Sequence, residues 1–390
     1  MSSKGIFGII DRYRDEAFRL LGRLIEVDSV NPPGNEHNVA QVLSEEFEEL
    51  GLKSSSYEKA KGRTNISCSI GEKNRPVFAI VCHSDTVPAG DGWTFPPFKA
   101  TLKDGRVYGR GAADDKGPLV SAVLALKALK ETKAKLKGKL MIIAAADEEK
   151  GSTYGVDYLL KVVGLRPDFA MVAEQTLSES LEIAEKGTLW LKLRCRGVQA
   201  HGSMPNLGVN AIQKLSKVLS AIGEFKMSYS PHPLLSGPTI NIGTIKGGIA
   251  PNVVAGEAEA ILDIRYLPSQ TPEGIMKELN AFIESLRKQD PKIDVVVEKV
   301  SSQIPTEVSS DNGFVKVVSG AVRSVLGKEP KLIGIGGATV AKSYLSYGIP
   351  ALMYGPGDEK IDHVANEYIE LDQVITAAKV MALSALDLLN

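Results

Sequence analysis

A histidine followed two residues later by an aspartate stands directly after a short apolar run, Val77–Cys82. The run predicts a buried strand, and residues i and i+2 of extended backbone share a face. Asp85 could therefore accept a hydrogen bond from one ring nitrogen of His83 and leave the other nitrogen for a metal ion, the arrangement that metal-bound histidines favour. The alternative is a histidine at a strand end beside an aspartate that forms a turn.

Carboxylates follow two more apolar runs, and a further pair lies in a glycine-punctuated loop that leads into a predicted helix. Adjacent acids at the end of a buried strand repel one another unless a cation or solvent compensates them. On extended backbone two consecutive side chains point in different directions, so one could bind a metal while the other faces a substrate cleft. An exposed acidic turn and a capped helix start are the alternatives. Asp147, Glu148 and Glu149 follow the run Met141–Ala146, and Glu174 follows the run Phe169–Ala173. The pair in the loop is Asp114 and Asp115.

The position and the types of these residues together predict a metal site. His83, the Glu148–Glu149 pair and Glu174 each follow a predicted buried strand, and ligands of open α/β sheets bind at the carboxyl ends of the strands. Imidazole and carboxylate ligands without thiolates suit a hydrolytic Zn²⁺, Mn²⁺ or Co²⁺ site better than a structural zinc site. His363 is a second candidate imidazole, in a run with aspartate, asparagine and glutamate neighbours.

The elements that must position these side chains alternate between strands and helices, which predicts a mostly parallel sheet flanked by helices. Near Lys186 the order changes to strand, helix, two strands, helix and strand, the pattern of a ferredoxin-like α+β module. The α/β pattern then resumes. We therefore expect an α/β domain in two pieces, residues 1–184 and 300–390, interrupted by a smaller inserted domain at residues 185–299.

Composition argues against several other classes of protein. The 390 residues carry 46 Lys and Arg against 47 Asp and Glu, a formal net charge of −1, which gives no support for a nucleic-acid or membrane partner. The three cysteines lack C-x-x-C spacing, which argues against disulfides and a zinc ribbon. No run has the length of a signal-peptide core or a transmembrane helix. We therefore expect a soluble, cytoplasmic protein. The sequence contains no phosphate-loop motif, which argues against a nucleotide-handling enzyme.

Taken together, the motifs resemble those of the dinuclear zinc peptidase and deacylase family, which includes succinyl-diaminopimelate desuccinylase, acetylornithine deacetylase, aminoacylase and glutamate carboxypeptidase. The resemblance covers nearly the whole chain, and an inserted ferredoxin-like lid between the last two motifs is similar to that family as well. The five motifs, in the family's order, are HSDTVP from His83, GRGAADDKG from Gly109, DEE from Asp147, AEQT from Ala173 and DHVANE from Asp362.

The resemblance implies two divalent metal ions, zinc in the first place with cobalt or manganese as alternatives. Asp114 would bridge both ions. One ion would be completed by His83 and Glu174, and the other by Glu149 and His363.

The same resemblance implies the chemistry of the site. Glu148 would be the general acid/base for a metal-bridging hydroxide, and Asp85 would orient His83. The peptide bond between Asp114 and Asp115 resembles one that is cis in this family.

The inserted domain is implied to act as a lid and a dimerisation domain. His201 resembles a lid histidine that reaches the site of a neighbouring subunit, which implies a homodimer. Asn252 and Arg265 resemble positions that bind the substrate carboxylate, and Gly337 and Thr339 lie in a loop that resembles the family's glycine loop. A surface-loop histidine and an ordinary strand-surface arginine are the alternatives.

The expected function is metal-dependent hydrolysis of an amide bond in a small N-acyl amino acid or short peptide with a free carboxylate. A carboxypeptidase, a dipeptidase or a broad N-acyl-amino-acid hydrolase is favoured, because the chain departs from the desuccinylase pattern after the glycine loop, where Val340, Ala341 and Lys342 replace an Asp and an Arg. The alternative is an N-succinyl- or N-acetyl-amino-acid deacylase of diaminopimelate, lysine or arginine biosynthesis. A non-catalytic binding protein on the same scaffold is a remote alternative.

Overall fold

The structure is a computed structural model that describes residues 3–390, with side chains from residue 5 onward. The chain divides into two compact units, each described here by itself. Unit 1 contains the described residues up to Ile183 together with Glu307–Ile333 and Thr339–Asn390. Unit 2 contains Ala184–Thr306 and Gly334–Ala338. The second unit thus extends beyond residue 299 and includes a short segment of the glycine loop.

A mainly parallel sheet forms the centre of unit 1, as the alternating pattern predicts. Its four middle strands run parallel in the order β6 (Lys139–Ala145), β3 (Val77–His83), β7 (Phe169–Val172) and β15 (Ala351–Met353). Every residue of β3 is buried, because a strand inside a covered parallel sheet has no solvent face. The sheet therefore aligns the carboxyl ends of β6, β3 and β7.

Five further strands widen this sheet, and the sequence patterns did not reveal them. The β1–β2 pair is antiparallel and joins β6, and β8 follows β15 at the other side. β1 and β2 are rich in serine, and the remaining three are short or weakly apolar, so none presents a clear period-two apolar pattern. Their bounds are β1 (Ser54–Glu58), β2 (Thr64–Gly71), β8 (Ser180–Glu185), β13 (Thr306–Glu307) and β14 (Lys331–Ile335).

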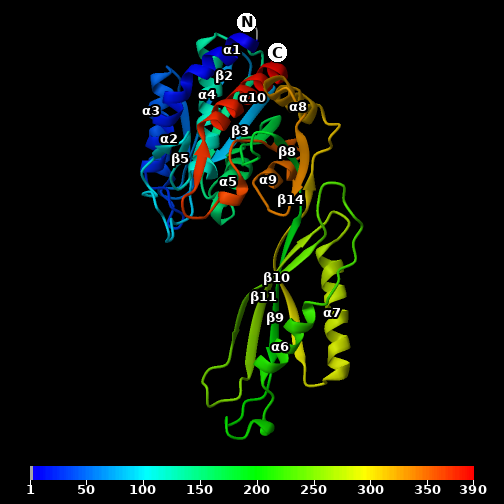
Figure 1. The fold of residues 1–390 in the computed structure, drawn as a ribbon. Coiled ribbons are helices and arrows are strands. Elements are labelled where there is room, and N and C mark those ends of the chain that lie inside the picture. Colours follow the sequence, from blue (N-terminus) through cyan, green and yellow to red (C-terminus); the bar gives the residue numbers. More distant parts are fainter. Residues whose placement is uncertain (1–2) are drawn as a thin grey trace. The chain divides into compact units, whose positions relative to one another are not determined.

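Long helices cover the sheet (Figure 1). α4 (Gly117–Glu131) and α10 (Leu371–Leu389) pack against each other and against β3 and β6, and both are apolar on most of their surface because other elements surround them. α3 (Glu36–Glu49) packs against β2, and the short helix α9 (Ala341–Ser346) packs against β7 and β15. The other helices are α1 (Ser3–Ile10), α2 (Arg14–Glu26), α5 (Val156–Tyr158) and α8 (Gly313–Leu326).

A small antiparallel sheet joins two distant parts of unit 1. Its strands are β4 (Thr101–Lys103), β5 (Arg106–Tyr108) and β16 (Tyr368–Glu370). β16 pairs with β5 so that Glu370 is opposite Arg106. The segment that follows His363 is therefore held beside the segment that leads to Asp114.

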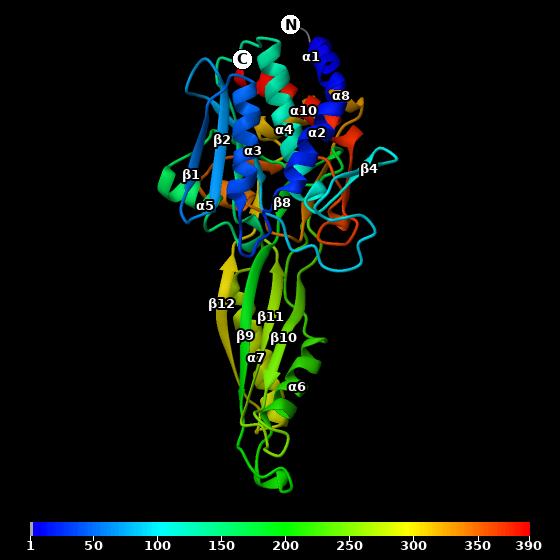
Figure 2. The same cartoon turned by 90° about the vertical axis from the view of Figure 1, so that its left-hand side faces the viewer.

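Unit 2 has the predicted ferredoxin-like arrangement, with an antiparallel sheet in the order β10-β11-β9-β12. Its two helices lie on one face of the sheet (Figure 2). Alternate residues of the inner strand β9, Leu189, Leu191 and Leu193, are buried in the core that these helices share with the sheet. The elements are β9 (Gly187–Arg196), α6 (Ala211–Ile222), β10 (Thr239–Gly247), β11 (Glu257–Tyr266), α7 (Pro272–Gln289) and β12 (Asp294–Gln303).

Local sequence signals explain where the helices of unit 2 begin. The side chain of Asn210 accepts hydrogen bonds from the first turn of α6, and the Thr271 hydroxyl accepts one from the first turn of α7. Among the helices of residues 3–390, none combines the length and the apolarity needed to cross a bilayer.

Candidate metal centre

The candidate ligands of unit 1 meet where the parallel strands end. β3 ends at His83, β6 ends two residues before Asp147, and β7 ends two residues before Glu174. Because these strands are parallel neighbours, the residues that follow them share one edge of the sheet.

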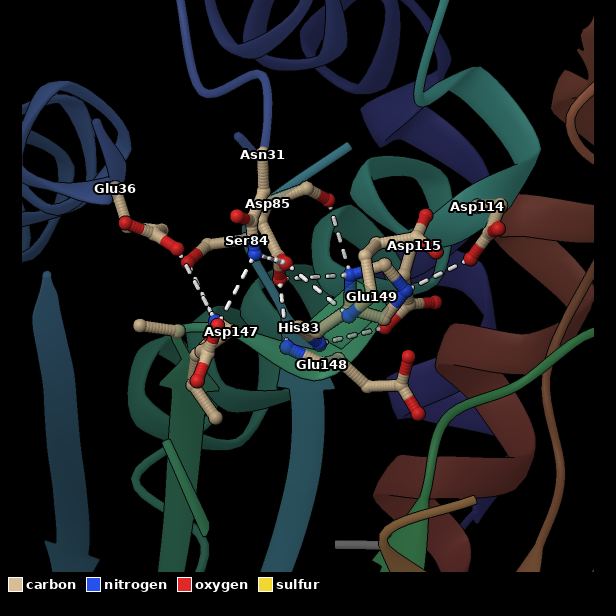
Figure 3. A network of polar contacts seen from close by, with 12 residues as sticks. Asn31, Glu36, His83, Ser84, Asp85, Asp114, Asp115, Asp147, Glu148 and Glu149 are labelled. Carbon is tan, nitrogen blue, oxygen red and sulfur yellow. Dashed lines mark hydrogen bonds and ion pairs between the residues drawn. The ribbon is translucent and has the colours of Figure 1, made fainter. Parts of the chain in front are cut away.

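His83 is oriented for binding a cation through its Nε2 atom (Figure 3). Its Nδ1 atom lies 3.0 Å from the backbone carbonyl oxygen of Asp85. A carbonyl can only accept, so Nδ1 carries the proton and Nε2 of the neutral ring has a free lone pair. That Nε2 atom lies 2.7 Å from Oδ1 of Asp114. The carboxylate of Asp85 is farther from the ring, with Oδ1 at 3.4 Å from Nδ1.

Asp114 lies between two imidazole rings that come from distant parts of the chain. Its Oδ1 atom faces His83 as described, and its Oδ2 atom lies 3.0 Å from Nε2 of His363. The same His363 nitrogen lies 3.2 Å from Oε1 of Glu149. The two oxygens of one carboxylate thus face two different sets of ligands, as a carboxylate that bridges two cations requires.

Two overlapping groups of ligand atoms could each hold a metal ion. Donor atoms of His83, Asp114 and Glu149 lie within 4.8 Å of one another, and so do donor atoms of His83, Asp115 and Glu174. Glu174 therefore lies with Asp115, a residue that the sequence analysis did not choose as a ligand. The peptide bond between Asp114 and Asp115 is cis. Buried Asp115 accepts a hydrogen bond from the backbone N–H of His83 at 2.9 Å.

The electrostatics of the centre fit divalent cations. Burial raises the pKa of Glu174 well above its ordinary value, and neighbouring Asp115 raises it further. Burial opposes a charge on His83, but the adjacent Asp114 carboxylate outweighs it and raises the pKa of the ring. Hydrogen bonds to Asp114 and then Glu149 raise the pKa of His363 to about 10. Such shifts report an excess of converging negative charge, and the oxygen and nitrogen donors suit Zn²⁺, Co²⁺ or Mn²⁺.

Glu148 and Glu149 do not lie on extended backbone, which corrects the expectation from the sequence. The chain turns at Asp147, whose φ of 67° is left-handed, and continues as a 3₁₀ turn at Glu148–Lys150. Figure 3 shows the two glutamate side chains leaving this turn in different directions. Burial, and then the charge of Glu149, raise the pKa of Glu148 to about 8, although nearby His83 lowers it.

The carboxylate of Asp85 holds this turn in place. It accepts hydrogen bonds from the backbone N–H of Glu148 at 3.1 Å and from that of Glu149 at 3.2 Å. Its Oδ2 atom also accepts one from Nδ2 of Asn31 at 2.8 Å. Asp85 therefore fixes both the histidine ring, through its main chain, and the paired glutamates, through its side chain.

A buried charge network holds Asp147, the residue at which this turn begins. No sequence pattern revealed this network. Arg63 forms ion pairs with Glu36 at 2.7 Å and with Asp147 at 2.9 Å. The Nδ2 atom of Asn31 joins this network to the centre, because it donates to Asp147 at 3.2 Å as well as to Asp85. Arg63, Glu36 and Asp147 are all buried. Their separation along the chain left no local pattern that could have revealed them.

In unit 2, His201 and Asn252 lie on neighbouring loops. A β-bridge joins His201 to Val253, and the N–H of Gly202 donates to the carbonyl oxygen of Asn252 at 2.8 Å. The backbone N–H of Ser203 donates to Nδ1 of His201 at 3.1 Å. The neutral ring therefore carries its proton on Nε2, which makes that atom a donor. Both residues are exposed.

Arg265 already has an anionic partner within unit 2. Its Nε and Nη2 atoms each lie 3.0 Å from a carboxylate oxygen of Asp263, and its Nη1 atom donates to the carbonyl of Gly336 at 3.1 Å. Gly337 follows Gly336 in the glycine loop and is half-buried. A substrate carboxylate at Arg265 would therefore share the guanidinium with Asp263.

Thr339 belongs to unit 1 and lies at the start of α9. Its hydroxyl accepts a hydrogen bond from the N–H of Ala341 at 3.2 Å and contacts the sulfur of Met353 at 3.1 Å. Lys342 is part of α9. The structure thus gathers the five candidate ligands, Glu148 and Asp85 in unit 1, while His201, Asn252, Arg265 and Gly337 belong to unit 2.

Comparisons with known proteins find relatives along nearly the whole chain. The family model described as peptidase family M20/M25/M40 matches residues 79–387. An uncharacterized metallohydrolase of Methanococcus maripaludis is 31% identical, over 94% of this chain and 97% of the relative. A probable succinyl-diaminopimelate desuccinylase of Staphylococcus aureus is also 31% identical, over 92% and 94%. The crystal structure of human carnosine dipeptidase 1 matches with a TM-score of 0.77 at 20% identity, over 100% of this chain and 99% of the other.

Proposed function

This chain belongs to the peptidase family M20/M25/M40 and is a metal-dependent hydrolase, and on that premise we propose that it cleaves the amide bond of a small N-acyl amino acid or short peptide with a free carboxylate. The observation that carries the proposal is the position of Asp114 between His83 and His363, with one carboxylate oxygen facing each ring. That arrangement suits hydrolysis assisted by two metal ions.

We propose two divalent ions, with zinc as the first candidate and cobalt or manganese as alternatives. Bound there, the ions would lower the pKa of a water molecule and polarise a carbonyl group. Asp115, beside His83 and Glu174, is a further candidate donor. The other residues that would hold the ions are His83, Asp114, Glu149, Glu174 and His363.

Glu148 is the proposed general acid/base. Its backbone N–H is fixed by Asp85, and its side chain leaves the same turn as that of Glu149 in a different direction (Figure 3). One glutamate can therefore hold a cation while the other exchanges protons with substrate and water. Glu148 would take a proton from water and deliver it to the leaving amine.

The residues of unit 2 are proposed to recognise the substrate. The Nε2 donor of His201 suits the stabilisation of a developing oxyanion. Asn252 and Arg265, with Gly337, are proposed to contact the substrate carboxylate. Thr339 of unit 1 is proposed as a further substrate-binding residue. The planar guanidinium of Arg265 can hold a carboxylate with two parallel bonds, as its contact with Asp263 illustrates.

We propose that the protein is a homodimer that associates through unit 2. β10 is an edge strand of the unit 2 sheet and is exposed along most of its length, and such an edge is a ready template for pairing with another chain. We expect light scattering at assay concentration to give twice the 41.8 kDa mass of the chain. A mass of one chain under those conditions would contradict the proposal.

A cytoplasmic location is proposed as well. The three cysteines, Cys68, Cys82 and Cys195, are buried and free, as is usual in a reducing compartment. The formal net charge of −1 gives no electrostatic footprint for nucleic acid or for an anionic membrane. The expected partners are therefore the small substrate and the second copy of the chain.

A mixed substrate panel tests the proposed function. Protein stripped with a chelator should lose hydrolysis, and added Zn²⁺, Co²⁺ or Mn²⁺ should restore it, because the ligand atoms at the centre are all oxygen and imidazole nitrogen. The panel contains N-acetyl, N-succinyl and N-formyl amino acids together with dipeptides and tripeptides. The best substrate decides between the favoured peptidase or broad N-acyl-amino-acid hydrolase and the alternative, an N-succinyl- or N-acetyl-amino-acid deacylase such as the desuccinylase relative. Cleavage that is unaffected by the chelator would overturn the proposal.

A further inference from the structure

We propose that Glu367 is a positioning residue that holds the Asp114 loop and the His363 segment in the one arrangement that binds the metal pair. The inference rests on the proposed function and adds to it a residue that supplies no ligand atom. It stands on the contacts of the Glu367 carboxylate, which is completely buried.

The carboxylate of Glu367 accepts four hydrogen bonds, two on each oxygen. Oε1 accepts the backbone N–H groups of Ala113 at 2.9 Å and Asp114 at 3.1 Å. Oε2 accepts the backbone N–H of Gly111 at 3.1 Å and Nη1 of Arg110 at 2.5 Å. Three of the four donors are consecutive or nearly consecutive main-chain groups of the loop that carries Asp114. The side chain therefore fixes the backbone from which the proposed bridging ligand projects.

The same residue is tied to the second ligand segment by the chain itself, since it follows His363 by four residues. Its carbonyl oxygen accepts the N–H of Gly109 at 3.0 Å, and β16 begins at the next residue and pairs with β5. The preceding residue, Asn366, accepts the N–H of Thr94 at 2.7 Å. Glu367 is thus the point where the His363 segment and the Asp114 loop are joined by both main-chain and side-chain bonds.

Arg110 has a different part in this arrangement. It neutralises the buried carboxylate, and its guanidinium also donates to the carbonyl of Ala89 at 3.0 Å and lies over the ring of Trp93. A conservative change at Arg110 should therefore affect stability, whereas a change at Glu367 should also release the loop amides. This difference separates positioning from simple charge neutralisation.

The geometry of Asp114 explains why such positioning matters for a metal. Its two oxygens face His83 and His363 only while the loop backbone and the His363 segment keep their relative places. Gln175 also holds this loop, because its side-chain amide donates to the carbonyl of Ala113 at 2.8 Å. A centre held in this way binds a metal tightly because the ligands need little rearrangement when the ion binds. Loss of such supporting contacts typically weakens metal affinity by about 10- to 100-fold.

The test is Glu367→Gln, measured as Co²⁺ affinity of the stripped protein by competition with a chelator. The amide has the size of the carboxylate, but its nitrogen cannot accept, so part of the donor set loses its partner. We expect affinity for the weaker-bound Co²⁺ to fall by about 10- to 100-fold. We also expect kcat to recover at excess Co²⁺, with an unchanged KM for substrate. If the variant only contained less folded protein, fewer Co²⁺ ions would bind per chain at both positions, and the Co²⁺ affinity of the folded fraction would not change.

The matched control is Glu370→Gln, the same change three residues later. Glu370 pairs with Arg106 at 3.1 Å in a half-exposed ion pair and bonds no part of the Asp114 loop, so Co²⁺ affinity should stay at the wild-type value. Arg110→Lys is the second comparison, because it keeps a cation beside Glu367 and all three amide bonds. We expect its Co²⁺ affinity to stay within about threefold of wild type.

Two results would overturn the proposal: wild-type Co²⁺ affinity in Glu367→Gln, or an equal loss of affinity in Arg110→Lys. If Glu367→Gln does not fold, Glu367→Asp keeps the charge with a shorter reach and should give the same direction of change. Unchanged affinity in that variant would count against the proposal in the same way. A failure of the proposed function is distinguishable, because the wild-type protein loaded with Co²⁺ would then hydrolyse no member of the substrate panel, whatever the Co²⁺ affinity of Glu367→Gln.

Discussion

Replacement of Glu148 by alanine is expected to lower kcat by about three orders of magnitude or more while the protein still binds its metal ions. A general base contributes about 10²- to 10⁴-fold to a reaction, and this one would also activate the nucleophile. Metal binding should persist because the candidate ligands that contact one another here are Asp114, His83, Glu149 and His363, and the substitution leaves them all in place. The measurement is kcat beside metal content, both on the same preparation.

Two other variants make the Glu148→Ala result specific. Glu149→Ala should lose rate and metal together, because Glu149 contacts His363 within the centre. Glu179→Ala should lose neither, because this exposed residue pairs with Lys328 on the surface. Activity retained by Glu148→Ala would exclude the role of this residue as acid/base, whatever the metal content of the variant.

Arg63→Leu is expected to lower the free energy of unfolding by about 3–5 kcal/mol, the usual cost of leaving a buried charge without its partner. Its guanidinium forms ion pairs with two buried carboxylates, those of Glu36 and Asp147. Both would remain in a site from which water is excluded. The measurement is urea unfolding of the metal-free protein, so that metal binding does not contribute.

The control for Arg63→Leu is Arg75→Leu. Arg75 pairs with Asp168, but its side chain is 65% exposed, so its removal should cost no more than about 1 kcal/mol. The double variant Arg63→Leu with Glu36→Gln should regain part of the lost stability, because one of the two unpaired charges is then absent. Equal costs for Arg63→Leu and Arg75→Leu would show that the buried network does not stabilise the fold.

The sequence predicted well the continuous apolar strands that the candidate ligands follow. His83 ends a strand that starts at Val77 as predicted, and the parallel order of β6, β3 and β7 was enough to place three ligand segments at one edge. The helices and the order of elements in unit 2 followed from periodicity for the same reason. Strong periodic patterns predict strands and helices, and the order of parallel strands predicts which strand ends lie side by side.

What the sequence could not predict depends on backbone detail and on long-range charge. The left-handed conformation of Asp147 replaces extended chain with a turn, and nothing in three consecutive acids indicates it. The pairs of Arg63 with Glu36 and Asp147 span 27 and 84 residues, beyond any local pattern. The Asp263–Arg265 pair is different, because residues i and i+2 of a strand share a face and the contact was readable in advance.

The order of the ligands along the chain has a consequence for biosynthesis. Four of the five candidate ligands, from His83 to Glu174, are synthesised before unit 2. The fifth, His363, and the proposed positioning residue Glu367 are synthesised after it. A nascent chain that has not yet reached residue 363 therefore contains only part of the candidate ligand set. It lacks the second imidazole and the Glu367 carboxylate that accepts hydrogen bonds from the Asp114 loop. We therefore expect an interrupted polypeptide to lack residues that would complete the proposed pair of metal ions.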